Sequence, residues 1–265
     1  MSKIQRALEK ARAEQEQATQ APPSGEPAGP TYVVRPPHAA QVDPHIVAYH
    51  HPHSHLTESF RRVKAMLRGV AGADKLRTVA ITSAGKGEGK STTALNLAIT
   101  MSQDFDTRVC IVDADLRRPR LHRLLGFTPR RGLSDVLGGD ALAEDVLITD
   151  SVPRLTVLPG GRSSRTPSEM LGSPRMRQLI EELKTRFDFI LFDTPPVLTV
   201  ADAILLGPMT DGVILLIQAG KVRRRPVERA VELLHNSRIL GFILNRGDMV
   251  LSHYGYRYYD RGYYY

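Results

Sequence analysis

The sequence predicts an α/β fold in which a mostly parallel central sheet carries helices on both faces. Short apolar runs rich in β-branched residues alternate with longer amphipathic segments, a pattern typical of strands joined by helical crossovers. A glycine-rich turn after one of the earliest runs is a further sign of this class. We expect strands at 78–82, 109–112, 155–158, 189–192, 213–217 and 239–244, and helices at 57–68, 90–101, 174–186 and 227–235.

The composition is that of a folded protein. Of the 265 residues, 42% are hydrophobic and 24% charged, so apolar burial can offset the entropy of ordering the chain. Cys110 is the only cysteine, which excludes a disulfide framework. No apolar run approaches the roughly 20 residues that cross a bilayer, and the N-terminal residues lack the apolar centre of a signal peptide. These features predict a cytoplasmic location.

Changes in composition divide the chain into three regions. Residues 1–55 begin with a short charged helix at 2–17 and continue into a segment rich in Pro, Gly and His, which we interpret as a flexible linker. Residues 56–250 contain all of the alternating runs and form the predicted main domain. Residues 251–265 form a tyrosine-rich tail.

The strongest functional signal is the loop after the predicted strand at 78–82. Residues 83–93 read SAGKGEGKSTT and lead directly into a predicted helix. Glycines allow backbone N–H groups to surround a phosphate, and the helix N-terminus adds positive potential. We expect Lys90 to contact the outer phosphates of ATP and Ser91 to bind Mg²⁺. The predicted nucleotide-binding residues of the loop are Gly85, Lys86, Gly87, Glu88, Gly89, Lys90, Ser91 and Thr92.

Two positions in this loop differ from the commonest pattern. Ala84 stands where the first glycine is usual. Lys86 precedes Lys90 by four residues, a spacing that resembles the variant phosphate loop of MinD/ParA-like ATPases. In that class the extra lysine reaches the nucleotide of a neighbouring subunit. The alternative is that Lys86 is an ordinary solvated loop residue.

Carboxylates follow two further predicted strands. Asp113 and Asp115 come at the end of one apolar run, and Asp193 comes at the end of another. Because the carboxyl ends of parallel strands line one crevice, we expect all three to converge beside Lys90. Asp193 has the position of a Walker B carboxylate, which holds Mg²⁺ directly or through water. The other two suit metal binding and acceptance of a hydroxyl proton, although either can instead cap the next turn.

The formal net charge of +8 raises the question of nucleic-acid binding. The basic residues are spread along the chain, and no aromatic residues alternate with them as a base-stacking surface requires. This pattern does not favour nucleic acid as a partner, and we expect solvated surfaces or contacts with phosphate or an acidic partner. The main basic groups are Arg117, Arg118, Arg120, Arg123, Arg130, Arg131 and the run 221–225.

Three motifs together resemble the bacterial tyrosine kinases (BY-kinases) of capsule and exopolysaccharide synthesis. They are GEGKS at 87–91, DADLR at 113–117 and DTPP at 193–196. The segments GLSDVLGG at 132–139, TPSEMLGSPRM at 166–176 and ILNR at 243–246 are also similar to the family. The resemblance extends from about residue 56 to the C-terminus. It implies a P-loop NTPase sandwich and an ATP- and Mg²⁺-dependent protein-tyrosine autokinase that regulates exopolysaccharide polymerisation and export.

The resemblance also implies roles for individual residues. The catalytic set is Lys90, Asp113, Asp115 and Asp193, and the metal ligands are Ser91, Asp115 and Asp193. We assign activation of the tyrosine hydroxyl to Asp113. At the end of the last predicted strand, Asn245 and Arg246 are expected to contact the adenine base, unless Asn245 only closes a turn.

The C-terminal tail resembles the autophosphorylation segment of this family. Seven of the nine tyrosines lie in the last twelve residues: Tyr254, Tyr256, Tyr258, Tyr259, Tyr263, Tyr264 and Tyr265. An adhesive or assembly role is the alternative for such a cluster. If the tails are phosphorylated in trans within a ring, the added charge favours disassembly by repulsion.

A helix near residue 60 resembles the oligomerisation motif Glu-x-x-Arg-x-x-Arg of these kinases. The matching residues are Glu58, Arg61 and Lys64. Lysine in the last place keeps the charge but loses the bidentate fork of arginine, so the contact is expected to be weaker. The motif predicts a ring-like homo-oligomer.

Partners and alternatives complete the expectations. The resemblance implies a membrane-anchored polysaccharide chain-length regulator as activator, which would hold the chain at the inner membrane. The helix at 2–17 either docks to that partner or is solvated. A MinD/ParA-type ATPase for positioning or partitioning, without kinase activity, is the alternative function, and an ATP-gated scaffold is a third.

Overall fold

The fold is an eight-stranded sheet between two helical layers. A computed structural model describes residues 33–34, 42–70, 76–149 and 152–247. The strands are β1 (Val33–Val34), β2 (Thr78–Ser83), β3 (Val109–Asp113), β4 (Ile148–Thr149), β5 (Leu155–Leu158), β6 (Phe189–Asp193), β7 (Gly212–Gln218) and β8 (Ile239–Asn245). Their order in the sheet is β1-β4-β5-β3-β6-β2-β7-β8, and all neighbours are parallel except β4 and β5.

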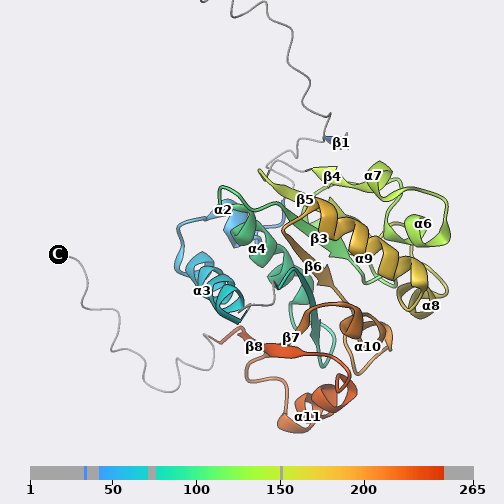
Figure 1. Ribbon diagram of the computed structural model, residues 1–265. Coiled ribbons are helices and arrows are strands. Elements are labelled where there is room, and N and C mark those ends of the chain that lie inside the picture. The colour runs from blue at the N-terminus through green and yellow to red at the C-terminus, as the bar shows by residue number, and fades with distance from the viewer. Residues whose placement is uncertain (1–32, 35–41, 71–75, 150–151, 248–265) are drawn as a thin grey trace, which may run out of the picture. The chain divides into compact units, whose positions relative to one another are not determined.

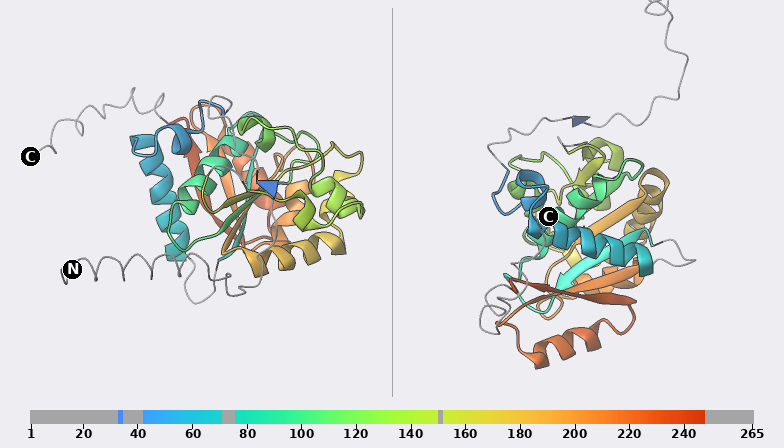
Figure 2. Two further views of the ribbon diagram at one scale, coloured as in Figure 1. Left: turned by 90° about the horizontal axis from the view of Figure 1, so that it is seen from above. Right: turned by 90° about the vertical axis from the view of Figure 1, so that its left-hand side faces the viewer.

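The helices lie on both faces of this sheet. One layer contains α2 (Val47–His50), α3 (His55–Val70), α4 (Lys90–Ser102) and α5 (Leu121–Leu124). The other contains α6 (Leu133–Gly138), α7 (Ala143–Val146), α8 (Pro167–Leu171), α9 (Pro174–Arg186), α10 (Asp202–Leu206), the 3-10 turn η2 (Gly207–Met209) and α11 (Arg224–Leu233). Figure 1 shows α3 and α4 on the opposite side of the sheet from α8 and α9, and Figure 2 gives the view from above. The predicted fold class is confirmed.

Alternate residues of the central strands feed two separate hydrophobic clusters. In β3, Val109 and Ile111 belong to the cluster beneath α4, whereas Cys110 and Val112 belong to the cluster beneath α9. Because both faces are covered, these strands are apolar throughout rather than alternating with polar residues. Cys110 is fully buried, as expected for a core residue.

The predicted element bounds hold with two differences of interest. Helix α3 begins at His55 rather than 57, because the Ser54 hydroxyl accepts the amide N–H of Thr57 (3.2 Å) and so caps the helix. Helix α11 begins at Arg224 rather than 227. Pro226 lies in its first turn, where a missing backbone N–H costs no hydrogen bond.

The structure corrects the interpretation of residues 42–54 as a flexible linker. Ile46 and Ala48 are buried against α4. The Asn96 side chain of α4 accepts the Ala48 amide N–H (2.8 Å) and donates to the His45 carbonyl (3.0 Å). The many His and Pro residues obscure the few apolar positions that make this contact. Residues 33–34 of the predicted linker form β1. The rest of the linker, the helix expected at 2–17 and the tail at 251–265 lie outside the described residues.

Candidate active site

The phosphate loop joins the carboxyl end of β2 to the start of α4. Gly87 and Gly89 have positive φ angles of 77° and 96°, and Gly89 is the residue before the first turn of α4. A Cβ atom on Gly89 would collide with the Nδ2 atom of Asn245. The backbone angle therefore favours glycine here, and any other residue would in addition displace the Asn245 side chain.

Glu88 holds this loop from inside the protein. Its side chain is buried, with one carboxylate oxygen accepting the Gly85 amide N–H and the other accepting the Gln218 amide N–H of β7 (3.3 Å). The Glu88 carbonyl accepts an N–H of the Asn245 side chain (2.8 Å). Glu88 thus positions the loop, and Gly85 and Glu88 do not line the cavity beside it.

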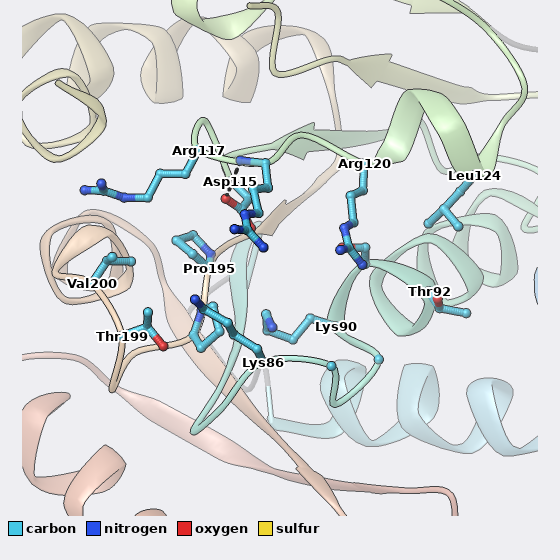
Figure 3. A pocket seen from close by; sticks show the side chains of 15 residues that line it. Lys86, Lys90, Thr92, Asp115, Arg117, Arg120, Leu124, Pro195, Thr199 and Val200 are labelled. Atoms are coloured by element: carbon cyan, nitrogen blue, oxygen red, sulfur yellow. Dashed lines mark hydrogen bonds between the residues drawn. The ribbon is translucent and has the colours of Figure 1, made fainter. Parts of the chain in front are cut away.

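A cavity of about 540 Å³ opens above the loop. Of the predicted nucleotide-binding residues, its lining contains Lys86, Gly87, Gly89, Lys90, Ser91 and Thr92. The facing wall comes from the segment after β3 and includes Asp115, Arg117 and Arg120 (Figure 3), while Pro195 and Thr199 come from the segment after β6. Loops after three neighbouring strands therefore form one crevice, as predicted from the parallel sheet.

Lys90 is almost completely buried at the base of this cavity. Burial lowers the pKa of its ammonium group, and the charges of Asp193, Asp115 and Glu88 oppose that shift in this order. A desolvated ammonium group among carboxylates and loop amides is suited to hold a phosphate, which provides several oxygen acceptors.

Asp113 and Asp193 lie side by side at the ends of β3 and β6. The two residues are direct partners in the strand register, and both are fully or almost fully buried. Burial raises the pKa of Asp193 to about 7, while the Ser91 hydroxyl and then the charge of Lys90 act in the opposite direction. Burial, together with the nearby Asp193 carboxylate, raises the pKa of Asp113 well above its usual range.

The two carboxylates differ in their hydrogen bonds. One oxygen of Asp113 accepts the amide N–H groups of Arg120 (2.8 Å) and Leu121 (2.9 Å), so Asp113 caps the turn that leads into α5. Within the described residues, neither oxygen of Asp193 has a hydrogen-bond partner of normal geometry. An unpartnered buried carboxylate is costly in free energy unless a cation or proton accompanies it.

Asp115 is the carboxylate that reaches the cavity. It is partly exposed, and its Oδ1 atom accepts the amide N–H of Arg118 (3.0 Å). Burial is the largest influence on its pKa and raises it, whereas the amide N–H of Arg118 and the charge of Lys90 act in the opposite direction. This differs from the sequence-based assignment, which gave Asp113 the role that requires access to a bound substrate.

An ion pair between the exposed Arg117 and the buried Asp202, which sequence reasoning missed, supports the segment carrying Asp115. The guanidinium group of Arg117 donates to both carboxylate oxygens of Asp202 (3.0 and 3.1 Å), and Asp202 is completely buried at the start of α10. The Ser168 hydroxyl also donates to Asp202 and itself accepts from Arg117 (2.9 Å). Asp202 lies in no recognisable motif, so only the tertiary structure reveals this contact.

Asn245 and Arg246 lie at the end of β8, outside the lining of the cavity. Besides its bond to Glu88, Asn245 accepts the amide N–H of Arg246 (2.9 Å), which has a positive φ of 58°. Asn245 therefore supports the phosphate loop and the turn that follows β8. The predicted contact of these two residues with adenine stays a prediction.

The residues of the predicted oligomerisation motif lie on α3. Glu58 and Arg61 form an ion pair with each other (3.0 Å), and Lys64 pairs with Asp104 (2.8 Å) and donates to the Thr100 carbonyl (3.3 Å). Lys64 is thus already engaged within its own chain. Self-association through this helix stays a prediction.

Comparisons with known proteins decide the family. The model of a family described as an AAA domain matches residues 76–236. The chain is 35% identical over 222 residues to the tyrosine-protein kinase YwqD of Bacillus subtilis, covering 83% of this chain and 93% of that protein. The chain belongs to the bacterial tyrosine kinase family. It is a protein-tyrosine kinase with a P-loop NTPase fold, as its motifs predicted.

A second relative is much longer than this chain. The succinoglycan biosynthesis transport protein ExoP of Rhizobium meliloti is 34% identical over 206 residues, which cover 75% of this chain and 26% of ExoP. In the described part of our chain, no helix is long and apolar enough to cross a membrane.

Solved structures agree with the sequence relatives. The kinase domain of the Escherichia coli tyrosine kinase ETK superposes with a TM-score of 0.74 at 29% identity, covering 77% of this chain and 80% of that one. The septum site-determining protein MinD of Pyrococcus horikoshii, solved with Mg-ADP, reaches 0.56 at 28% identity over 65% of this chain and 71% of that one. The higher TM-score with ETK and the names of the sequence relatives support the kinase function over the MinD/ParA-type alternative.

Proposed function

We propose that this kinase transfers phosphate from ATP to the tyrosines of its own C-terminal tail, and that it does so in the regulation of exopolysaccharide synthesis. The observation that carries the proposal is the presence of Lys90 and Asp115 in the lining of the cavity beside the phosphate loop, with the buried Asp193 close enough to Lys90 for their charges to interact. The tail supplies the acceptors, Tyr254, Tyr256, Tyr258, Tyr259, Tyr263, Tyr264 and Tyr265.

ATP fits the wall of the cavity that the phosphate loop forms, which we call the first wall. The amide groups of Gly87 and Gly89 and the ammonium group of Lys90 supply donors for the phosphates. Lys86 lies on the same wall, where its ammonium group places a positive charge near the phosphates of a nucleotide bound to its own or a neighbouring subunit. Glu88 and Asn245 hold the loop in place through their hydrogen bonds.

Mg²⁺ fits the donors at the end of β6. The two unpartnered oxygens of Asp193 and the nearby Ser91 hydroxyl are hard oxygen ligands of the kind that this ion prefers, with Asp115 as a further carboxylate. When bound, the ion neutralises charge that develops on the phosphates. Binding of a cation would also compensate the buried charge of Asp193.

Asp115 is the residue we assign to the tyrosine hydroxyl. In the transfer, a bond forms between the tyrosine oxygen and the γ-phosphorus, the bond from that phosphorus to ADP breaks, and the hydroxyl proton passes to Asp115. Its exposure to the cavity and its raised pKa suit a proton acceptor. Asp113 lies outside the cavity lining and has one oxygen committed to capping α5, so we assign it a supporting role for the segment after β3.

The partner and assembly belong to the same proposal. ExoP, named as a transport protein, contains a segment similar to this chain within a much longer sequence. This supports a separate membrane-anchored chain-length regulator as the activator here, with the kinase held peripherally at the membrane. Glu58, Arg61 and Lys64 on α3 would then mediate a ring of kinase subunits, in which one subunit modifies the tail of the next.

Mass spectrometry of the intact chain and of its C-terminal peptides tests the proposal. The full chain is incubated with ATP and Mg²⁺, with and without the cytoplasmic end of a chain-length regulator, beside Lys90→Met. We expect increments of one phosphate on residues 254–265 that require Lys90 and are abolished by chelation of the metal. An unmodified tail despite ATP hydrolysis in the presence of the regulator would reject tail autophosphorylation.

A further inference from the structure

A second cavity, which we call the basic groove, adjoins the nucleotide cavity. It measures about 480 Å³, and its lining includes Arg118, Arg120, His122, Arg123, Gly161 and Ser163. Within the described ranges, no carboxylate lies within ion-pair distance of the guanidinium groups of Arg118, Arg120 or Arg123. The groove thus concentrates positive charge that these parts of the chain do not neutralise, which favours an anionic occupant.

The groove is continuous with the site of phosphoryl transfer. Arg117, Arg118 and Arg120 line both cavities. The charge of Arg120 also opposes the rise in the pKa of Asp193 and contributes to the lowered pKa of Lys90, so its guanidinium group acts on the reacting end of the nucleotide cavity. A ligand in the groove would therefore lie beside the tyrosine that accepts the phosphate.

The sequence of the tail indicates which anion fits. Residues 254–265 contain Arg257 and Arg261 against the single acid Asp260, so the unmodified tail does not complement a basic groove. Each phosphotyrosine adds about −1.5 to −2 charge and three strong acceptor oxygens. Tyr254, Tyr256 and Tyr258 are two residues apart, which corresponds to about 7 Å in an extended segment. A phosphotyrosine can thus occupy a site adjacent to the next acceptor.

We propose that the basic groove binds phosphotyrosine of a partly modified tail, so that the first phosphate promotes the addition of the next. The inference rests on the proposed function, because it assumes that the tail is the substrate. It predicts that a tail with one phosphotyrosine gains its next phosphate faster than an unmodified tail gains its first. Arg123 is the residue to test, since it lines the groove and not the nucleotide cavity.

A binding measurement tests the groove without any turnover. The full chain is first treated with a phosphatase, and fluorescent peptides of residues 254–265 are titrated with and without phosphate on Tyr258. We expect the phosphopeptide to bind at least about tenfold more tightly, because arginine–phosphate contacts are charge-assisted. Arg123→Glu should abolish this preference. Arg130→Glu makes the same charge change at an exposed position outside the groove and should preserve it.

Two results would overturn the assignment. Equal affinity of the two peptides for the unaltered chain would show that the groove does not select phosphate. Displacement of the phosphopeptide by a non-hydrolysable ATP analogue, with no effect of Arg123→Glu, would place the peptide in the nucleotide cavity instead.

A time course of intact mass tests the consequence for turnover. In the unaltered chain and in Arg130→Glu, we expect species with several phosphates to appear while little singly modified chain accumulates. Arg123→Glu should form the first phosphate at the normal rate and then accumulate the singly modified species. Identical distributions in all three chains would contradict the proposal. If no chain gains phosphate even with the cytoplasmic end of the regulator present, the proposed tail phosphorylation fails, and the peptide measurement still decides whether the groove selects phosphotyrosine.

Discussion

The loop after β2 and the segment after β3 face each other across one cavity, yet they are built in opposite ways. The first, residues 84–89, uses glycines with positive φ and backbone amides, and its Glu88 side chain is turned inward to hold it. The second, residues 114–120, presents a carboxylate and several guanidinium groups. The first wall suits any nucleoside triphosphate, whereas we propose that groups of the second select the acceptor and take its proton. Asp193 on β6 lies between them.

The largest effect should come from Asp193, where the two walls meet. Its pKa is raised to about 7 in the folded chain and is about 4 when unfolded. The folded state therefore holds a proton that the unfolded state has lost, and without metal stability should fall as the pH rises from about 4 to about 7. The full difference approaches about 4 kcal/mol. Denaturant titrations from pH 4 to 8 check this.

Asp193→Asn provides the comparison for this prediction. The variant should lose the part of the slope that Asp193 contributes, while the raised pKa values of Asp113 and Asp115 leave a weaker slope of the same sign. It should be more stable than the unaltered chain at pH 7.5, because position 193 then buries no charge. In the unaltered chain, Mg²⁺ should restore stability above pH 7. A stability curve that rises with pH from 4 to 7 and is unaffected by Asp193→Asn would contradict the account.

Gly89→Ala tests the first wall alone. Its φ of 96° costs any other residue about 1–3 kcal/mol, and the added Cβ displaces Asn245. We expect ATP to bind about 10- to 100-fold more weakly in a calorimetric titration. Gly69→Ala is the matched control, since Gly69 lies in α3 with open space around its Cβ position. Normal ATP binding by Gly89→Ala would show that the loop does not hold the nucleotide in this conformation.

Asp202→Asn tests the second wall. The change weakens the hold on Arg117 and so disturbs the position of Asp115, without touching the phosphate loop. We expect kcat for phosphate transfer to fall about tenfold while the affinity for ATP stays within twofold, since about one charge-assisted hydrogen bond is lost. Asp188→Asn, which removes an exposed partner of Arg108, should alter neither quantity. A fall in ATP affinity alone would reject the division of labour between the walls.

The smallest effect is expected from Lys86→Ala. Lys86 is exposed at the rim of the cavity, where one charge contributes at most about 1 kcal/mol. In dilute chain the affinity for ATP should therefore fall less than about fivefold. A larger loss that appears only at high concentration of the chain would indicate that Lys86 acts on the nucleotide of a neighbouring subunit. Lys221→Ala, outside the cavity, serves as control.

The sequence predicts the structure of the first wall better than that of the second. The first wall is local: glycine spacing and GKS before a helix imply its position, and Lys90 and Ser91 line the cavity as expected. The division between Asp113 and Asp115 depends on which side chain meets the amides of α5, a contact that spacing alone does not reveal. Two further contacts join segments that are distant in the sequence: the Arg117–Asp202 pair and the packing of Ile46 against α4. No local sequence pattern predicts such contacts.

Asp113→Asn and Asp115→Asn test the central claim, that Asp115 and not Asp113 accepts the tyrosine proton. The amide oxygen introduced at Asp113 can still accept the N–H groups of α5, so this variant should phosphorylate the tail at a rate within a few-fold of normal. Asp115→Asn should bind ATP but lose at least about 100-fold in the rate of tail phosphorylation, followed by intact mass. The reverse pattern, with Asp115→Asn active and Asp113→Asn inactive, would contradict the account.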